Sequence, residues 1–152
     1  TPDYLAPEVI SGTGHNKAFD WWTLGILIYE MIESLPPFYN ENPMQTYAKI
    51  MHGSIKFSNK FNKPLINLIK QLLQPKPTKR LGALKSGTNG VRNHDWFKGF
   101  DWNKLKLGQI KAPIIPDIKS MEDLSNFDDY SENDRSEDPD FDSDQFSWDQ
   151  NF

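Results

Sequence analysis

The stretch AFDWWTLGILIYEM, residues 18–31, decides the fold of this chain. Apolar side chains occur on nearly every side of it, whereas an amphipathic surface helix carries a polar stripe. We therefore predict a helix that is buried all round. It is too short to span a bilayer and is interrupted by Asp20 and Glu30. Because a buried carboxylate is costly unless it is hydrogen-bonded or paired, each acid is expected to have a partner elsewhere.

The composition indicates one domain with a hydrophobic core. The chain has 152 residues and no cysteine, which excludes a disulfide framework and a cysteine-based zinc site. Its 3 histidines lie far apart without metal-ligand spacing. We find no signal peptide and no membrane span in the sequence. The first residues fall inside a motif without an initiator Met, so we expect the chain to be the C-terminal part of a longer protein.

The net charge of −4 conceals an asymmetry. Residues 1–116 carry 15 Lys or Arg against 8 Asp or Glu, whereas residues 117–152 carry 2 against 13. A basic body can indicate nucleic-acid binding. Here the lysines are scattered and no aromatic–basic platform accompanies them, so nucleic acid is not an expected partner. Residues 131–145 are rich in Asp, Glu and Ser and are expected to be flexible.

Turn residues and apolar spacing predict the remaining elements. Residues 1–8 contain two prolines without periodicity and should form a shaped loop. A second helix should begin at Asn42-Pro43, with a buried face made of Met44, Tyr47, Ile50 and Met51. A third should cover residues 64–73 and bury Leu65, Ile66, Leu68, Ile69, Leu72 and Leu73. Further elements are a loop at 82–90, a short helix at 91–97 and an extended segment at 112–116.

Five motifs occur in a characteristic order and spacing, and the first four of them resemble the large lobe of eukaryotic protein kinases. They are TPDYLAPE at 1–8, DWWTLG at 20–25, PPF at 36–38, TKRLG at 78–82 and NFDDY at 126–130. The last resembles the tail motif of the AGC group of serine/threonine protein kinases. The body is most similar to cAMP-dependent catalytic subunits, whereas the aromatic end at 146–152 resembles cGMP-dependent kinases.

The resemblance implies a mainly α fold with two parts. Residues 1–97 would be the C-terminal portion of the kinase large lobe, with helices F to I of that fold. Residues 98–152 would be the AGC-kinase C-terminal extension. The implied activity is transfer of the γ-phosphoryl group of ATP to Ser or Thr in basic, Arg-containing peptide sites.

The resemblance also implies roles for residues near the peptide. Thr1 would bind substrate and hydrogen-bond the catalytic loop, since a hydroxyl both donates and accepts. Pro2 and Leu5 would form the wall of an apolar pocket for the residue after the phosphoacceptor. Glu30 would pair with a substrate Arg, and Asp3 would add a weaker acidic contact further out.

Further roles are structural or lie at the nucleotide. Asp20 would accept hydrogen bonds from catalytic-loop amides and support that loop. Glu8 and Arg80 would form a buried bidentate ion pair, because the guanidinium fork matches a carboxylate. Phe127 would contribute a flat apolar surface to the adenine pocket. Tyr47 would either help dock a regulatory partner or pack in the core, and the two interpretations stay open.

The groups that perform phosphoryl transfer do not occur in this sequence. It contains no Gly-rich phosphate loop, no catalytic-loop His/Tyr-Arg-Asp and no Asp-Phe-Gly. ATP and Mg²⁺ are therefore expected as cofactors of the longer parent, and the chain alone is expected to be inactive. Expected partners are basic protein substrates and a cyclic-nucleotide-binding regulatory subunit or fused domain. The expected location is the cytoplasm, with the nucleus second. The alternative is a pseudokinase or truncated module that only binds partners.

Overall fold

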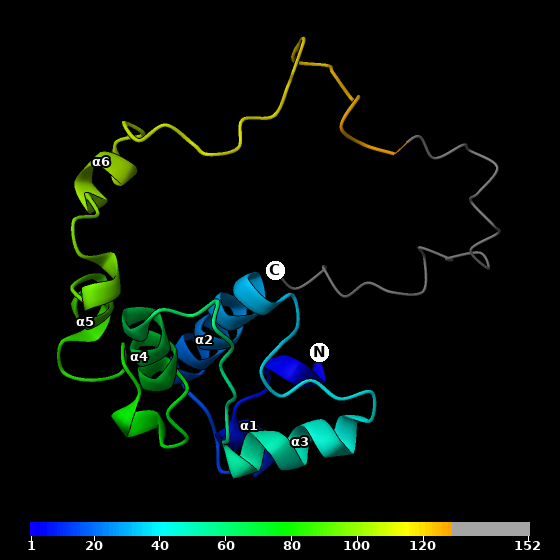
Figure 1. The fold of residues 1–152 in the computed structure, drawn as a ribbon, viewed down its shortest axis with the longest axis vertical. Coiled ribbons are helices and arrows are strands. Elements are labelled where there is room, and N and C mark those ends of the chain that lie inside the picture. Colours follow the sequence, from blue (N-terminus) through cyan, green and yellow to red (C-terminus); the bar gives the residue numbers. More distant parts are fainter. Residues whose placement is uncertain (129–152) are drawn as a thin grey trace, which may run out of the picture. The chain divides into compact units, whose positions relative to one another are not determined.

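The computed structural model describes residues 1–128, in which the regular elements are all helices and no strand occurs (Figure 1). In chain order the elements are the 3-10 helix η1 (Pro2–Tyr4), α1 (Pro7–Ile10), α2 (Ala18–Glu33), α3 (Pro43–His52), α4 (Lys63–Leu72), η2 (Pro77–Lys79), α5 (Gly87–Arg92), η3 (Asp95–Phe97) and α6 (Trp102–Lys106). This confirms the predicted mainly α fold. The chain divides into two units, the first being Thr1–Gln109 and the second beginning at Ile110.

Helix α2 is the centre of the first unit, but it is not buried all round as predicted. Trp22 and Ile26 are fully buried, whereas Leu27 and Met31 expose 43% and 66% of their surface. Asp20 is exposed as well, so its predicted burial is also wrong in this chain. The reason is that α2 packs against α4, η1 and η2, which do not cover its whole circumference.

Helices α2 and α4 pack closely side by side (Figure 1). A Cβ at Gly25 would lie 2.8 Å from Leu73 Cδ2, so the glycine is what allows this approach. The α4 face matches the prediction, with its single exception Ile66, which is half-buried. The buried members are Leu65, Leu68, Ile69, Leu72 and Leu73.

A second glycine, Gly82, also lies close to α2. Gly82 has φ +89°, and a Cβ built on it would lie 2.3 Å from Trp21 Cδ2. The indole of Trp21 therefore occupies the space that any other side chain would need. The left-handed backbone adds a second reason for glycine at this position.

Helix α3 begins where predicted, but the face that it buries is narrower than the predicted one. The Asn42 side chain accepts a hydrogen bond from Met44 N at 2.9 Å, and Pro43 occupies the first turn. Thr46 and Ile50 are buried, whereas Met44 and Met51 expose 69% and 51%. The predicted four-residue face is thus wrong at both methionines. Helix α3 packs against the small elements η1 and α1, which cover only one stripe of it.

Two segments contain more helix than predicted. Residues 1–10 form η1 and α1, because Pro2 and Pro7 stand at the first positions, where proline favours a helical start. Helix α5 begins at Gly87, inside the predicted loop 82–90, and ends at Arg92. The predicted helix 91–97 is therefore divided between α5 and η3.

The first unit ends in an aromatic cluster. The ring of Trp102 lies 4.9 Å from that of Phe97 and 4.8 Å from that of Phe100, centroid to centroid. Its indole Nε1 donates to the Arg92 carbonyl at 3.1 Å. The compact unit thereby continues through α6, beyond residue 97.

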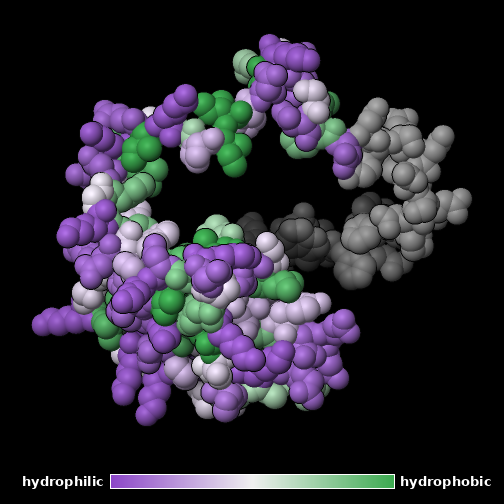
Figure 2. Space-filling model, in the orientation of Figure 1, coloured by the Kyte–Doolittle hydropathy of each residue, from purple (hydrophilic) through white to green (hydrophobic). Residues whose placement is uncertain are grey.

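The second unit contains neither helix nor strand over residues 110–128. Residues 112–116 lie within this irregular segment. Many of its apolar side chains are exposed, and Figure 2 shows green patches along it. The predicted flexibility of 131–145 and the aromatic end at 146–152 lie outside the described residues. No helix within residues 1–128 has both the length and the apolar character needed to cross a bilayer.

Candidate functional site

The N-terminal turn and helix α2 meet through Tyr4 and Glu30. The Tyr4 hydroxyl donates a hydrogen bond to Glu30 Oε2. Backbone bonds shape the turn itself, from Tyr4 N to the Thr1 carbonyl and from Leu5 N to the Pro2 carbonyl, each at 3.3 Å. The Glu30 carboxylate is therefore held through Oε2, and its second oxygen, Oε1, accepts no hydrogen bond from another residue within 1–128.

The surroundings of this pair are negatively charged. The hydrogen bond to Glu30 is the largest cause that raises the pKa of Tyr4 to about 12, followed by burial and by the charges of Glu30 and Asp3. Asp3 Oδ1 is buried without a hydrogen-bond partner among the described residues. A buried, unsatisfied carboxylate oxygen is costly. The site therefore favours a cationic hydrogen-bond donor.

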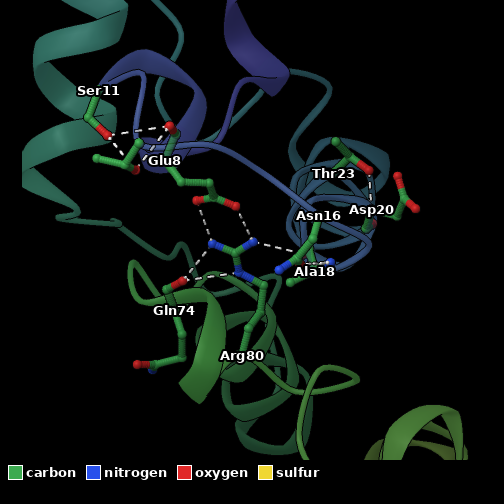
Figure 3. A network of polar contacts seen from close by, with 9 residues as sticks. Glu8, Ser11, Asn16, Ala18, Asp20, Thr23, Gln74 and Arg80 are labelled. Carbon is green, nitrogen blue, oxygen red and sulfur yellow. Dashed lines mark hydrogen bonds and ion pairs between the residues drawn. The ribbon is translucent and has the colours of Figure 1, made fainter.

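The other predicted peptide residues lie around this turn. Pro2 and Leu5 are half-buried and Thr1 is exposed. Asp20 lies at the opposite end of α2 from Glu30, and its carboxylate points away from the other labelled residues in Figure 3. It lines a hollow of about 290 Å³ together with Lys17, Trp21, Leu24, Gly82, Gly87 and Thr88. The structure thus groups the N-terminal turn with Glu30 and leaves Asp20 apart from them.

Glu8 and Arg80 form a buried bidentate pair (Figure 3). Arg80 Nη1 donates to Glu8 Oε1 at 2.8 Å, and Nη2 donates to Oε2 at 3.0 Å. Nη1 also donates to the Ala18 carbonyl at 2.7 Å, while Nε and Nη2 donate to the Gln74 carbonyl at 3.1 and 3.0 Å. All five guanidinium N–H groups therefore have an acceptor.

These contacts tie four segments of the first unit together. Arg80 is fully buried, and its guanidinium lies 5.2 Å from the centroid of the Trp22 ring. Burial alone would raise the pKa of Glu8. The hydrogen bonds and charge of Arg80 and a backbone hydrogen bond outweigh this, so the pKa lies below its usual value. The carboxylate is thus charged in the folded chain, and the pair is a structural feature rather than a reactive one.

Tyr47 and Phe127 occupy very different surroundings. Tyr47 is half-buried on α3 between the exposed Met44 and Met51. Phe127 belongs to the second unit and exposes 73% of its surface. It lines a hollow of about 440 Å³ with Leu124, Ser125 and Asp128. An exposed aromatic ring beside an open hollow fits the adenine group that the resemblance implies.

The sequence reasoning missed two parts of this arrangement. The hydrogen bond from the Tyr4 hydroxyl to Glu30 was not predicted. The carbonyls of Ala18 and Gln74 were also missed as acceptors for Arg80. A signal was available for the second, because a buried Arg paired with one carboxylate still has donors left to satisfy.

Comparison with known proteins connects this geometry to a family. Residues 1–97 match the protein kinase domain. The chain is 48% identical over 134 residues to "cAMP-dependent protein kinase catalytic subunit 3" of Drosophila melanogaster, covering 88% of this chain and 23% of that protein. It is 48% identical over 134 residues to "cAMP-dependent protein kinase catalytic subunit PRKX" of Homo sapiens, covering 88% and 37%.

A third relative extends the match further along the chain. It is the "cAMP-dependent protein kinase catalytic subunit" of Schizosaccharomyces pombe, which is 45% identical over 146 residues and is matched over 28% of its length. The chain thus spans between 23% and 37% of the length of these three relatives.

Proposed function

This chain belongs to the protein kinase family, in its AGC group, and from this we propose that it is part of a serine/threonine kinase that phosphorylates basic peptide sites. Catalytic subunits of cAMP-dependent kinases are its relatives, so the cAMP-dependent type is favoured over the cGMP-dependent type. In the proposal, residues 1–97 are the C-terminal portion of the large lobe and residues 98–152 are the C-terminal extension. The proposed location is the cytoplasm, with the nucleus second.

The observation that supports this function most is the acidic site at the N-terminal turn. Glu30 accepts a hydrogen bond from the Tyr4 hydroxyl on Oε2, and within residues 1–128 neither Glu30 Oε1 nor the buried Asp3 Oδ1 has a hydrogen-bond partner. A substrate guanidinium carries five N–H groups in a fixed fork and can donate to the second oxygen of Glu30. We assign Glu30 to a substrate Arg upstream of the phosphoacceptor and Asp3 to a weaker outer contact.

The same turn provides the rest of the proposed peptide contact. Pro2 and Leu5 are half-buried and present apolar surface for the residue that follows the phosphoacceptor. Thr1 is exposed and its hydroxyl is available to the parent's catalytic loop. Asp20 lines its own hollow and provides acceptor oxygens for the backbone amides of that loop.

Mg-ATP supplies the γ-phosphoryl group when it is bound to the parent. In this chain Phe127 would contribute apolar surface beside the adenine. We assign the Mg²⁺ ligands, the catalytic base and the phosphate loop to parts of the parent outside residues 1–152. Purified residues 1–152 should therefore show no phosphoryl transfer, and a measurable transfer rate would contradict this.

The Glu30 assignment is tested with two peptides in the parent kinase. One contains the upstream Arg and the other has Ala in its place. We expect Glu30→Ala to raise KM for the Arg peptide by about ten- to a hundredfold, since a charge-assisted hydrogen bond contributes about 1.5–3 kcal/mol. KM for the Ala peptide should hardly change.

A matched control for this test lies on the same helix. Glu33 pairs with the exposed Lys60 at 2.9 Å, so Glu33→Gln removes an acidic charge from α2 without touching the N-terminal turn. It should leave both KM values unchanged. An unaltered preference for Arg in Glu30→Ala would refute the assignment.

The second candidate is a non-catalytic partner-binding protein. It is favoured by the surface of α3, where Met44 and Met51 are exposed on either side of Tyr47. A cyclic-nucleotide-binding regulatory subunit or fused domain is the proposed partner of this surface. The sequence upstream of Thr1 decides between the candidates. Intact His/Tyr-Arg-Asp and Asp-Phe-Gly motifs there would support the enzyme, and their replacement would support the binding protein.

A further inference from the structure

Residues 117–127 form a turn organised by the side chain of Asp123. Asp123 Oδ2 accepts a hydrogen bond from Lys119 N at 2.8 Å, and Oδ1 accepts one from Ser125 N at 2.9 Å. The carboxylate thus binds the backbone on both sides of its own position. Among residues 110–128 Asp123 is the one residue that is not exposed, being half-buried.

Further hydrogen bonds continue the turn as far as Phe127. The Asp123 amide donates to the Ser120 carbonyl at 3.2 Å, and the Phe127 amide donates to the Leu124 carbonyl at 2.9 Å. Asn126 Nδ2 donates to the Asp117 carbonyl at 3.1 Å. The Asp123 carboxylate and the Phe127 ring therefore belong to one hydrogen-bonded structure.

Apolar packing does not explain the order of this turn. All the large apolar side chains within it are exposed: Ile118 by 61%, Met121 fully, Leu124 by 72% and Phe127 by 73% of their surface. The amide of Lys119, followed by the contacts of Ser125, holds the pKa of Asp123 below its usual value, in keeping with an ionised acceptor. Polar contacts to Asp123 are thus what shape the backbone that carries the ring.

We propose that Asp123 is a positioning residue for nucleotide binding, because its carboxylate pre-forms the turn that presents Phe127 to adenine. This inference rests on the proposed function, in which Phe127 contacts ATP. A ring on a pre-formed turn loses less conformational freedom on binding than one on an irregular chain. Removing the carboxylate lowers the fraction of molecules that are ready to bind and so weakens the apparent affinity.

The test measures Kd for Mg-ATP and KM for peptide in the parent kinase. Asp123→Ala should raise Kd for Mg-ATP about fivefold, because the backbone amides of Lys119 and Ser125 lose the carboxylate that accepts their hydrogen bonds. Asp123→Asn keeps one oxygen acceptor and should have a smaller effect. The control is Glu122→Gln, which removes a neighbouring exposed acid and should leave Kd unchanged. KM for peptide should not change in any of the three.

A double-mutant cycle shows whether Asp123 acts through Phe127. Phe127→Ala should raise Kd for Mg-ATP, and adding Asp123→Ala to it should cause no further rise. A fivefold rise in that background would overturn the inference, as would an unchanged Kd in Asp123→Ala when Phe127→Ala weakens binding. If Phe127→Ala itself leaves Kd unchanged, the proposed adenine contact fails and the inference fails with it.

The turn can also be observed without nucleotide. In the full chain, the backbone amide resonances of Lys119 and Ser125 should shift in NMR spectra of Asp123→Ala and stay in place in Glu122→Gln. Unchanged amide resonances of Lys119 and Ser125 in Asp123→Ala would contradict the hydrogen bonds of the turn. This result is independent of nucleotide, so it is distinguishable from a failure of the adenine contact.

Discussion

The Tyr4 hydroxyl donates a hydrogen bond to the Glu30 carboxylate, although the two residues are 26 positions apart in the chain. The bond joins the N-terminal turn to helix α2 and fixes one oxygen of the acid that we assign to a substrate Arg. Tyr4 thereby positions Glu30 without occupying the oxygen that would face the peptide.

Tyr4→Phe removes this hydroxyl and keeps the ring. In the parent kinase we expect KM for the Arg peptide to rise about fivefold, which corresponds to about 1 kcal/mol for one hydrogen bond. This is less than for Glu30→Ala, because the charge of Glu30 remains. Steady-state kinetics with the two peptides check it, with Tyr39→Phe as the control at an exposed tyrosine. An equal rise for the peptide that lacks the Arg would count against the positioning role.

The same bond predicts how Tyr4 titrates. Its pKa is raised to about 12 chiefly by the hydrogen bond to Glu30, so the neutral phenol is favoured in the folded chain. The resulting stabilisation is fully present below the unfolded pKa of about 10 and is lost as pH rises toward 12. Glu30→Gln should move the Tyr4 pKa back toward 10.

Absorbance titration of tyrosinate measures this change. The signal of Tyr4 is the difference between the full chain and its Tyr4→Phe variant, recorded with and without Glu30→Gln. A Tyr4 pKa that is the same in both backgrounds would show that Glu30 does not cause the shift.

The buried ion pair predicts a large effect on stability. Arg80→Met leaves the Glu8 carboxylate buried without its partner and should lower the free energy of unfolding by about 3–5 kcal/mol. Because the two residues share one hydrogen-bond network, the double variant Glu8→Gln with Arg80→Met should lose less free energy of unfolding than the sum of the losses in the two single variants. Urea unfolding of the full chain measures this, with the exposed Arg92→Met as control. Additive losses would contradict direct coupling.

Lowering the pH should remove the contribution of the Glu8 carboxylate to the stability of the fold. Its folded pKa is lowered, so the carboxylate stabilises the fold above the unfolded pKa of about 4.3 and loses this contribution as pH falls through the folded pKa. The difference in free energy of unfolding between the chain and Glu8→Gln should be constant from about pH 7 to 5 and then narrow. Urea unfolding across this range tests the sign, and a difference that widened in acid would contradict it.

Substitutions at Gly82 and Gly12 distinguish the loss of stability caused by a steric clash from that caused by backbone strain. Gly82→Ala places a Cβ against Trp21 at a left-handed position and should destabilise the chain by about 2–4 kcal/mol. Gly12 is a matched control, since its φ is +64° but a Cβ there would meet nothing within 4 Å. Gly12→Ala should cost only about 1–2 kcal/mol. Equal losses in thermal unfolding would show that the indole moves aside.

The sequence predicted elements whose signals are local. Helix α4 follows from its apolar spacing, and the start of α3 follows from Asn42-Pro43, because caps and prolines act within one turn. The exposure of Leu27 and Met31 was not predictable, since apolar spacing does not say how many neighbours surround a helix. The Tyr4–Glu30 bond could not be predicted either, because it depends on how a turn and a distant helix meet.

The pairing of Arg80 with Glu8 also has a consequence for folding during synthesis. The two residues are 72 positions apart, so their contact closes a long loop. The chain loses the conformational entropy of that loop before the hydrogen bonds can compensate for it. A ribosome makes Glu8 long before Arg80, and until then the α1 segment lacks the partner that holds its carboxylate. We therefore expect α1 and the N-terminal turn to become ordered only after residue 80 has emerged, so the edge that we assign to the peptide substrate would be among the last parts of this unit to fold.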